Sequence, residues 1–201
     1  MLGIIRQKVF TKNDKLDFKM EILLGRKQAA ECLVLPPNQK IVDVATGTGT
    51  LAYELAKLGH SVVGIDVSTE MLNLAMKKYS KNLDLSFEQA DATHLLFKNN
   101  NFDAASISFA LHDMPYEDEI KVLQEMKRVT KPNGHILIVD YNEPRNHWAA
   151  KLAFPLIRAS ESTNWLPFIN RGLESLLQEV NLRVSRRITY LGVIQIVVID
   201  C

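Results

Sequence analysis

The fold follows from one stretch, Ile41-Val-Asp-Val-Ala-Thr-Gly-Thr-Gly-Thr50. Apolar and β-branched residues lead into a loop with glycines at 47 and 49, and a helical pattern begins at residue 50. Glycine carries no Cβ, so the backbone can turn sharply and approach a ligand closely. The helix that follows offers unpaired N–H groups to an anion. The stretch predicts a strand, a glycine loop and a helix. As G-x-G-x-x-A it also fits a dinucleotide fingerprint, and a purely structural turn would use the same glycines.

The alternation of strand and helix continues along the chain. Strands are expected at 41–44, 61–65, 84–88, 102–108 and 136–139, and helices at 17–34, 50–58, 69–79 and 116–130. Such alternation requires right-handed crossovers and a mostly parallel sheet covered by helices on both faces. Two extended runs, 187–191 and 194–200, are separated by a link that permits only an antiparallel hairpin. We predict an α/β, doubly wound, Rossmann-like, mostly parallel seven-stranded sheet that ends with one reversed strand.

Length and composition restrict the class of protein. The chain has 201 residues, which suits one α/β domain over 1–201, with a helical segment at 1–35 and another at 145–180. Of its residues, 47% are hydrophobic and 23% charged, as in ordinary globular proteins. Its 24 basic and 23 acidic residues leave a net charge of +1, which disfavours a nucleic-acid partner.

Cysteines and histidines show no pattern typical of a metal site. The cysteines at 32 and 201 form no C-x-x-C motif, and the five histidines contain no H-x-x-x-H pair. The N-terminal apolar run is too short for a signal peptide, and no run approaches the ~18 apolar residues that span a bilayer. We expect a cytoplasmic protein with no metal.

Carboxylates follow the next two strands, at the sheet edge where ligands of open α/β folds bind. Asp66 ends the second strand and can accept hydrogen bonds from both hydroxyls of a ribose. Capping the next helix is the alternative, although Ser68 or Thr69 would cap it better. Asp91-Ala92 follows the third strand and could hold an adenine, whereas a turn-forming aspartate would look the same. The pattern predicts a nucleoside site.

Five motifs occur in order: Ile41–Gly49, Val63-Gly-Ile-Asp66, Gln89-Ala-Asp-Ala92, Phe102–Ser108 and Lys127–Gly134. Through them the span 20–200 resembles the class I S-adenosylmethionine-dependent methyltransferases. Ala45–Gly49 and Ile107–Leu111 are similar to segments of the C-methyltransferases of ubiquinone and menaquinone biosynthesis. Where those enzymes usually continue Leu-Arg-Asn, this chain has Leu111-His112-Asp113, and its N-terminal segment lacks their Tyr-Asp start. The resemblance implies the cofactor and leaves the acceptor open.

S-adenosyl-L-methionine is the cofactor that this resemblance implies. The resemblance also implies that the cofactor would be contacted by Thr48, Asp66, Asp91, Ala92 and Ser108. The full predicted cofactor-binding set is Ala45, Thr46, Gly47, Thr48, Gly49, Asp66, Val67, Met71, Asp91, Ala92 and Ser108.

His112 is the one candidate catalytic residue, as a general base, because imidazole titrates near neutral pH. Capping or packing beside Asp113 is the alternative. Methyl transfer from a sulfonium mainly requires alignment, so a base is needed only if the acceptor arrives protonated. Tyr141, Asn142 and Glu143 could line the acceptor pocket or form a plain loop.

Aromatic residues interleave with basic ones over 145–171. They are Trp148, Phe154, Trp165 and Phe168, with Lys151, Arg158 and Arg171. The resemblance makes residues 145–180 the cover over a small-molecule methyl acceptor that is quinone-like or otherwise lipophilic. Core packing of the aromatics and weak contact with a membrane surface are the alternatives.

Two other functions remain open. An NAD(P)-dependent oxidoreductase would also use the glycine loop and Asp66, but Tyr53-x-x-x-Lys57 lies too early in the chain to reach a hydride acceptor. A non-catalytic cofactor-binding domain would keep the fold without turnover.

Overall fold

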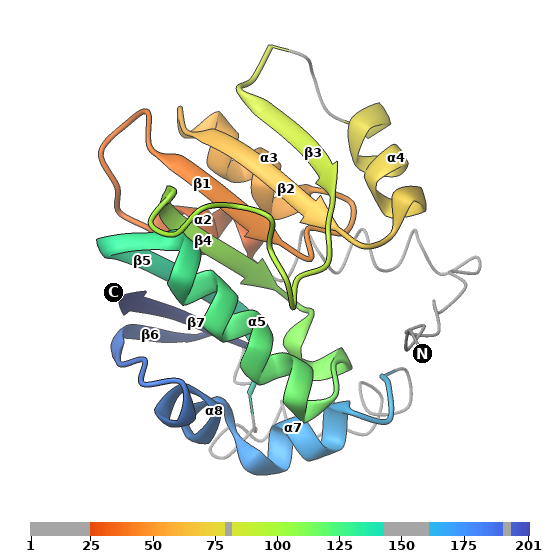
Figure 1. Ribbon diagram of the computed structural model, residues 1–201, viewed down its shortest axis with the longest axis vertical. Coiled ribbons are helices and arrows are strands. Elements are labelled where there is room, and N and C mark those ends of the chain that lie inside the picture. The colour runs from red at the N-terminus through yellow and green to blue at the C-terminus, as the bar shows by residue number, and fades with distance from the viewer. Residues whose placement is uncertain (1–24, 79–81, 143–160, 191–193) are drawn as a thin grey trace.

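Strands and helices alternate along the computed structural model, which describes residues 25–78, 82–142, 161–190 and 194–201 (Figure 1). The described helices are α2 (Arg26–Cys32), α3 (Thr50–Lys57), α4 (Thr69–Lys78), α5 (Tyr116–Val129), α7 (Trp165–Arg171) and α8 (Leu173–Glu179), with a 3-10 turn η1 (Leu111–Asp113). The described strands are β1 (Lys40–Val44), β2 (Ser61–Asp66), β3 (Leu85–Gln89), β4 (Phe102–Ser108), β5 (Thr130–Tyr141), β6 (Val184–Tyr190) and β7 (Ile194–Asp200).

These strands form a seven-stranded sheet in the order β3-β2-β1-β4-β5-β7-β6. Strands β1 to β5 are parallel to one another, and β7 is antiparallel to both β5 and β6. The expected α/β fold with one reversed strand is therefore confirmed. One detail differs, because the reversed strand β7 lies between β5 and β6 and the sheet ends with β6 instead. The order in which strands are added to the sheet reverses between β1 and β4, which is the switch point of a doubly wound sheet.

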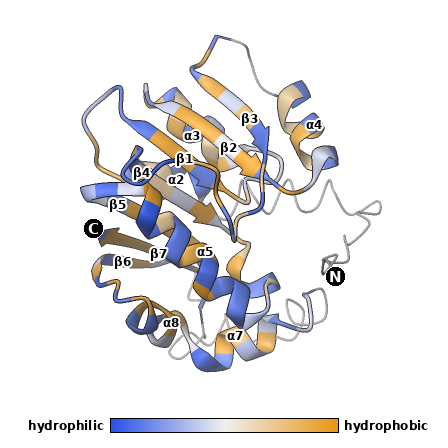
Figure 2. Ribbon diagram, in the orientation of Figure 1, coloured by the Kyte–Doolittle hydropathy of each residue, from blue (hydrophilic) through white to orange (hydrophobic). Residues whose placement is uncertain are grey.

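Both faces of the sheet are buried, which explains the continuously apolar strands. Val42, Val44, Ile136 and Ile138 face the core beneath α5, α7 and α8, whereas Ile41, Leu137 and Val139 face the core beneath α2 and α3. Alternate residues of one strand thus enter different cores, as the two-residue period of a strand requires. Figure 2 shows the apolar residues along the central strands and a mixed pattern on α5.

Strand β5 differs most from its sequence prediction. The sequence predicts this strand only over 136–139. In the structure Thr130 already pairs with Phe102, and regular pairing resumes at His135 after a shift in register. A Cβ at Gly134 would lie 2.6 Å from the carbonyl oxygen of Asp103, so only glycine allows this approach.

Parts of the two predicted flanking segments, 1–35 and 145–180, lie outside the described residues. The single domain over 1–201 therefore stays a prediction. No helix in the described part of the chain combines the length and the apolar character needed to cross a membrane.

Phe87 of β3 lies over two glycines and ties the first half of the sheet to the glycine loop. A Cβ at Gly64 would lie 2.8 Å from the Phe87 ring and 2.8 Å from Thr46 Oγ1. We expect Gly64→Ala to lower the free energy of unfolding by about 1–3 kcal/mol through overpacking, as measured by urea denaturation. Ser61→Ala on the same strand is the control. Adding Phe87→Leu to Gly64→Ala should restore part of the loss, and a purely additive double variant would contradict this packing.

Candidate active site

The predicted site residues lie at the carboxyl ends of β1, β2, β3 and β4. Positive φ values occur at Ala45 (51°), Gly47 (55°) and Gly49 (74°). The Thr46 N–H donates to the carbonyl of Ile65, 2.8 Å away, so the loop after β1 is held against β2. The sequence prediction of a tight glycine loop between β1 and α3 is confirmed.

Gly47 and Gly49 are required in this loop for different structural reasons. A Cβ at Gly49 would lie 2.6 Å from the Phe87 ring and 3.1 Å from the Ala75 Cβ, so this glycine permits packing. A Cβ at Gly47 would meet no atom within 4 Å. Gly47 therefore faces open space, where a ligand could approach the backbone.

Asp43 anchors the loop from below. Its carboxylate is fully buried and accepts hydrogen bonds from the Thr46 hydroxyl (2.6 Å) and the Ser106 hydroxyl (2.7 Å). Burial raises the pKa of Asp43 from 3.8 to about 6, although both hydrogen bonds and the charge of Arg26 act in the opposite direction. Asp43 thereby joins β1, the glycine loop and β4. Sequence reasoning missed this role, although a carboxylate within the apolar run Ile-Val-Asp-Val was the available signal.

Asp66 connects the same loop to β2. One carboxylate oxygen accepts the Gly47 N–H and the other accepts the Ser68 N–H, each at 2.8 Å. The Ser68 hydroxyl in turn accepts the Met71 N–H at 3.3 Å, so Ser68 caps α4 as the sequence suggested. The half-buried Asp66 carboxylate keeps further acceptor capacity on both oxygens.

Asp91 follows the neighbouring strand, but it also forms a turn. The exposed Asp91 accepts hydrogen bonds from the N–H and the hydroxyl of Thr93, both at 2.8 Å. The Ala90 N–H donates to the Asp66 carbonyl at 3.1 Å, which brings the ends of β2 and β3 together. Asp91 therefore does form a turn, which the sequence left open as its other role. Adenine binding at Asp91 stays a prediction.

The remaining predicted residues surround this edge with different exposures. Ala92 and Met71 are half-buried, whereas Val67 is 55% exposed and its carbonyl accepts a hydrogen bond from the Gln89 side chain. The Thr48 hydroxyl lies 3.4 Å from the Thr50 hydroxyl, near the start of α3. Ser108 is buried at the end of β4.

Arg26 of α2 brings a positive charge to this edge, and no motif in the sequence marked it. Its Nε donates to the Ser108 hydroxyl at 3.2 Å, and its guanidinium lies 4.9 Å from the centre of the Phe109 ring. The positive charge of Arg26 also acts to lower the pKa of Asp43, against the effect of burial. Arg26 therefore belongs to the site, although it lies far from the other site residues in sequence.

His112 lies in a buried group of charges after β4. Its Nδ1 is 2.6 Å from Asp140 Oδ1, and its Nε2 is 3.3 Å from Glu161 Oε2 and 3.5 Å from Asp113 Oδ2. Burial opposes protonation of His112, but the charge of Asp140 and hydrogen bonds to Asp140 and Glu161 prevail and raise its pKa to about 10. The imidazole is therefore charged near neutral pH. His112 does pack beside Asp113, as one interpretation of the sequence expected. Its contacts with Asp140 and Glu161 were not predicted from the sequence.

Aromatic residues of the predicted cover pack inside the protein where the structure describes them. Trp165 and Phe168 are each only 1% exposed and belong to the core beneath α5, so core packing is the observed alternative for both. Tyr141 is buried, and its hydroxyl donates to Glu161 Oε1 at 2.9 Å. Asn142 is half-buried. Trp148, Phe154, Lys151, Arg158 and Glu143 lie outside the described residues.

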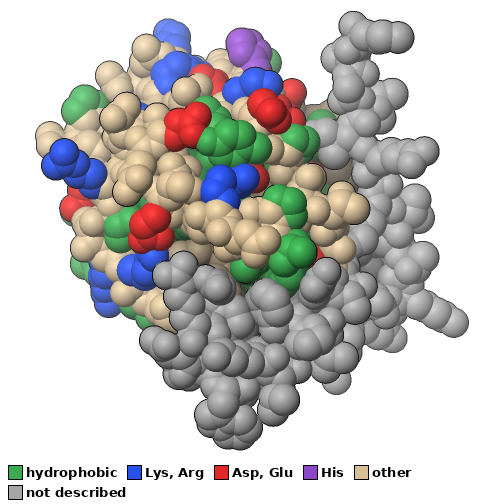
Figure 3. All heavy atoms as spheres, turned by 90° about the horizontal axis from the view of Figure 1, so that it is seen from below, with side chains coloured by type: hydrophobic (Ala, Val, Ile, Leu, Met, Phe, Trp, Pro, Cys, Tyr) green, Lys and Arg blue, Asp and Glu red, His purple; other side chains and the backbone are tan. Residues whose placement is uncertain are grey.

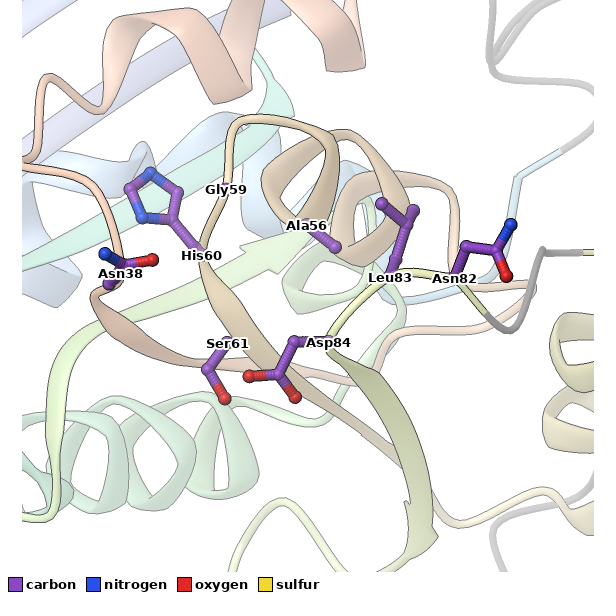
Figure 4. A pocket seen from close by; sticks show the side chains of 8 residues that line it. All are labelled: Asn38, Ala56, Gly59, His60, Ser61, Asn82, Leu83 and Asp84. Carbon is purple, nitrogen blue, oxygen red and sulfur yellow. The ribbon is translucent and has the colours of Figure 1, made fainter.

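A cavity of about 280 Å³ lies at the other end of the strands (Figure 4). Its lining includes His60 and Ser61 at the start of β2 and Asp84 just before β3. The glycine loop and Asp66 lie at the opposite, carboxyl ends of these strands. This cavity is therefore separate from the candidate site.

The raised pKa of Asp43 predicts a pH dependence of stability. Between about pH 4 and pH 6 the folded state binds more protons at Asp43 than the unfolded state, so this carboxylate lowers stability as the pH rises. We expect the free energy of unfolding of the native protein, minus that of Asp43→Asn, to fall by about 2–2.5 kcal/mol from pH 4 to pH 7. Urea denaturation at both pH values measures this difference. Groups such as Asp103 and Glu125, whose pKa values are lowered, affect both proteins and cancel. A pH-independent difference would contradict the prediction.

Comparison with known proteins agrees with the arrangement of motifs. Residues 41–134 match the family model described as methyltransferase domain. A ubiquinone/menaquinone biosynthesis C-methyltransferase from Bdellovibrio bacteriovorus is 38% identical over 123 residues, which cover 60% of this chain and 52% of that protein. A demethylmenaquinone methyltransferase from Streptomyces avermitilis is 38% identical over 149 residues, covering 74% of this chain and 61% of that protein. The chain thus spans between 52% and 61% of the length of these two relatives.

Solved structures show the same fold. A SAM-dependent methyltransferase from Aquifex aeolicus superposes with a TM-score of 0.73 at 22% identity, covering 94% of this chain and 96% of that one. A SAM-dependent methyltransferase from Methanosarcina mazei gives a TM-score of 0.65 at 22% identity, covering 83% of this chain and 93% of that one. Residues 41–134 therefore match a methyltransferase domain, the chain has the fold of solved S-adenosylmethionine-dependent methyltransferases, and it is similar in sequence to methyltransferases of quinone biosynthesis.

Proposed function

We propose that this chain transfers a methyl group from S-adenosyl-L-methionine to a small-molecule acceptor. The observation that carries the proposal is the pairing of Asp66 with the Gly47 N–H, which places a carboxylate beside an open stretch of backbone. When bound, S-adenosylmethionine supplies a methyl group on an activated sulfonium. The protein then mainly has to align the two reactants and exclude water.

The residues at this edge fit such a cofactor. Both Asp66 oxygens can accept a further hydrogen bond, which suits the two hydroxyls of a ribose. The open space at Gly47 allows a ligand to approach the loop, and Asp91-Ala92 on the neighbouring strand end suits the adenine. At β4, the Arg26 guanidinium suits the carboxylate of the methionine moiety.

The acceptor would bind on the other side of the switch point, near His112 and Tyr141. As a charged imidazolium, His112 donates hydrogen bonds, and it becomes a general base only after its Nε2 proton has moved to a neighbouring carboxylate such as Glu161. The relatives named above support a quinone-like or otherwise lipophilic acceptor. Three points stay predictions: that residues 145–180 cover the acceptor, that the protein makes weak contact with a membrane surface, and that it is cytoplasmic.

The alternative functions receive less support. The family model and the relatives named above are methyltransferases, so they give an NAD(P)-dependent oxidoreductase no support. Basic and acidic side chains intermingle on the face shown in Figure 3, so its described part carries no extended basic surface for a nucleic acid. A non-catalytic cofactor-binding domain is distinguished by turnover.

Asp66 provides the test of cofactor binding. We expect Asp66→Ala to lower the affinity for S-adenosylmethionine by roughly a hundredfold or more, because two charged hydrogen bonds of about 1.5–3 kcal/mol each are lost. Isothermal titration calorimetry measures this change. Asp84→Ala, at the amino end of the same strand pair, should keep the native affinity. Unchanged affinity in a folded Asp66→Ala protein would contradict the proposed site.

His112 provides the test of turnover. With labelled S-adenosylmethionine and a panel of hydroquinones and other lipophilic molecules, we expect labelled product and release of S-adenosylhomocysteine. His112→Ala should lower kcat by about 10²–10⁴-fold while the Kd for S-adenosylmethionine stays unchanged. Cofactor binding without any labelled product would favour the non-catalytic domain.

A further inference from the structure

Three side chains that can ligate a metal ion converge after β4. They are His112, Asp113 and Glu161, and one ligand atom of each lies within 4.8 Å of the other two. Glu161 lies just before α7, so the fold brings it to the other two from a distant part of the chain. Among the described residues this is the one group of at least three such side chains.

The two separations from the imidazole match the coordination shell of a small divalent ion, and the two carboxylate oxygens lie within 4.8 Å of each other. His112 Nε2 lies 3.3 Å from Glu161 Oε2 and 3.5 Å from Asp113 Oδ2. In a tetrahedral zinc site with bonds of about 2.0–2.1 Å, neighbouring ligand atoms are about 3.3–3.4 Å apart. An ion at the centre of the three atoms would therefore need only small movements of the side chains.

Partners outside the cluster already orient two of its members. Asp140 is 1% exposed, and its Oδ1 lies 2.6 Å from His112 Nδ1, which directs the opposite ring nitrogen, Nε2, into the cluster. The Tyr141 hydroxyl donates to Glu161 Oε1 at 2.9 Å and leaves Oε2 facing His112. A carboxylate behind the imidazole is the usual support for histidine ligands of metal ions.

Charge and exposure also suit a cation. The carboxylates of Asp113, Asp140 and Glu161 surround one imidazole, so a dication that displaces the His112 Nε2 proton into solvent would balance more negative charge than that proton does. The side chain of Asp113 is 48% exposed, compared with 17% for Glu161 and 4% for His112. An ion could therefore reach the buried imidazole from the side of Asp113.

We propose that His112 Nε2, Asp113 Oδ2 and Glu161 Oε2 form a binding site for a divalent transition-metal ion, with Zn²⁺ as the best fit. An imidazole ligand favours Zn²⁺ and its neighbours over Mg²⁺ or Ca²⁺. Three protein ligands leave a fourth position open to water or to an oxygen of a bound small molecule, as in catalytic rather than structural zinc sites. No pattern in the sequence indicates this metal site, because the histidines lack a ligand spacing and Glu161 is remote from His112 along the chain.

The test uses the full chain after removal of bound metal with a chelator. We expect one Co²⁺ per chain to bind with the strong visible absorption of tetrahedral coordination, and one Zn²⁺ to displace it. Calorimetry with Zn²⁺ gives the affinity. His112→Asn and Glu161→Gln should each weaken Zn²⁺ binding at least tenfold and abolish the Co²⁺ spectrum. Asp140→Asn, a positioning residue, should weaken binding about 10–100-fold.

A second histidine–aspartate pair supplies the matched control. His135 Nδ1 lies 2.9 Å from Asp200 Oδ1, but this pair belongs to no group of three ligands among the described residues. His135→Gln should therefore keep both the Co²⁺ spectrum and the Zn²⁺ affinity. If Asp140→Asn fails to fold, Tyr141→Phe, which releases Glu161, should still weaken binding.

Several outcomes would overturn the metal site. They are absence of the tetrahedral Co²⁺ spectrum, equal Zn²⁺ affinity in the native protein and Glu161→Gln, and an equal loss in His135→Gln. The measurements need no methyl transfer, so they stand apart from the proposed function. A chain that binds Zn²⁺ but not S-adenosylmethionine would contradict only the methyltransferase proposal.

Discussion

The buried carboxylate of Asp43 holds the switch point of the sheet in one geometry. Burying a carboxylate is costly unless hydrogen bonds compensate for the lost water, and here the hydroxyls of Thr46 and Ser106 offset part of that cost while the pKa stays raised. Because these donors come from the loop after β1 and from β4, the carboxylate fixes both against the end of β1. The positive φ angles of the loop are stabilised by this attachment and by Asp66, which accepts the Gly47 N–H.

Two groups of charge flank that fixed point. Asp66 and Asp91 follow β2 and β3, whereas His112 and Asp140 lie at the ends of β4 and β5. Strand order turns back between β1 and β4, so the two groups lie on opposite sides of the glycine loop. An in-line methyl transfer needs a donor and an acceptor aligned from two sides. The two groups of charge at the carboxyl ends of the strands suit that requirement. Arg26 adds a positive charge between them, at the end of β4.

Particular elements show how far the sequence predicts this structure. The residues of β4 were predicted at 102–108 as observed, because a buried apolar run between turn residues identifies a strand locally. Strand β5 was predicted too short, since the pairing of Thr130 with Phe102 depends on a partner strand. The glycine loop was located correctly, but only the packing of Phe87 shows that Gly49 serves the core while Gly47 faces open space.

The amino-acid sequence alone predicts the order of strands and helices, the parallel α/β class and the positions of Gly47, Asp66 and Asp91 at strand ends. Those features follow from hydrophobic period and turn residues over short stretches. Long-range packing places Asp43 against Ser106, and it places His112 among Asp113, Asp140 and Glu161. Burial and charge pairing arise from contacts between residues remote in sequence, and they set the protonation state of His112, which no local pattern encodes.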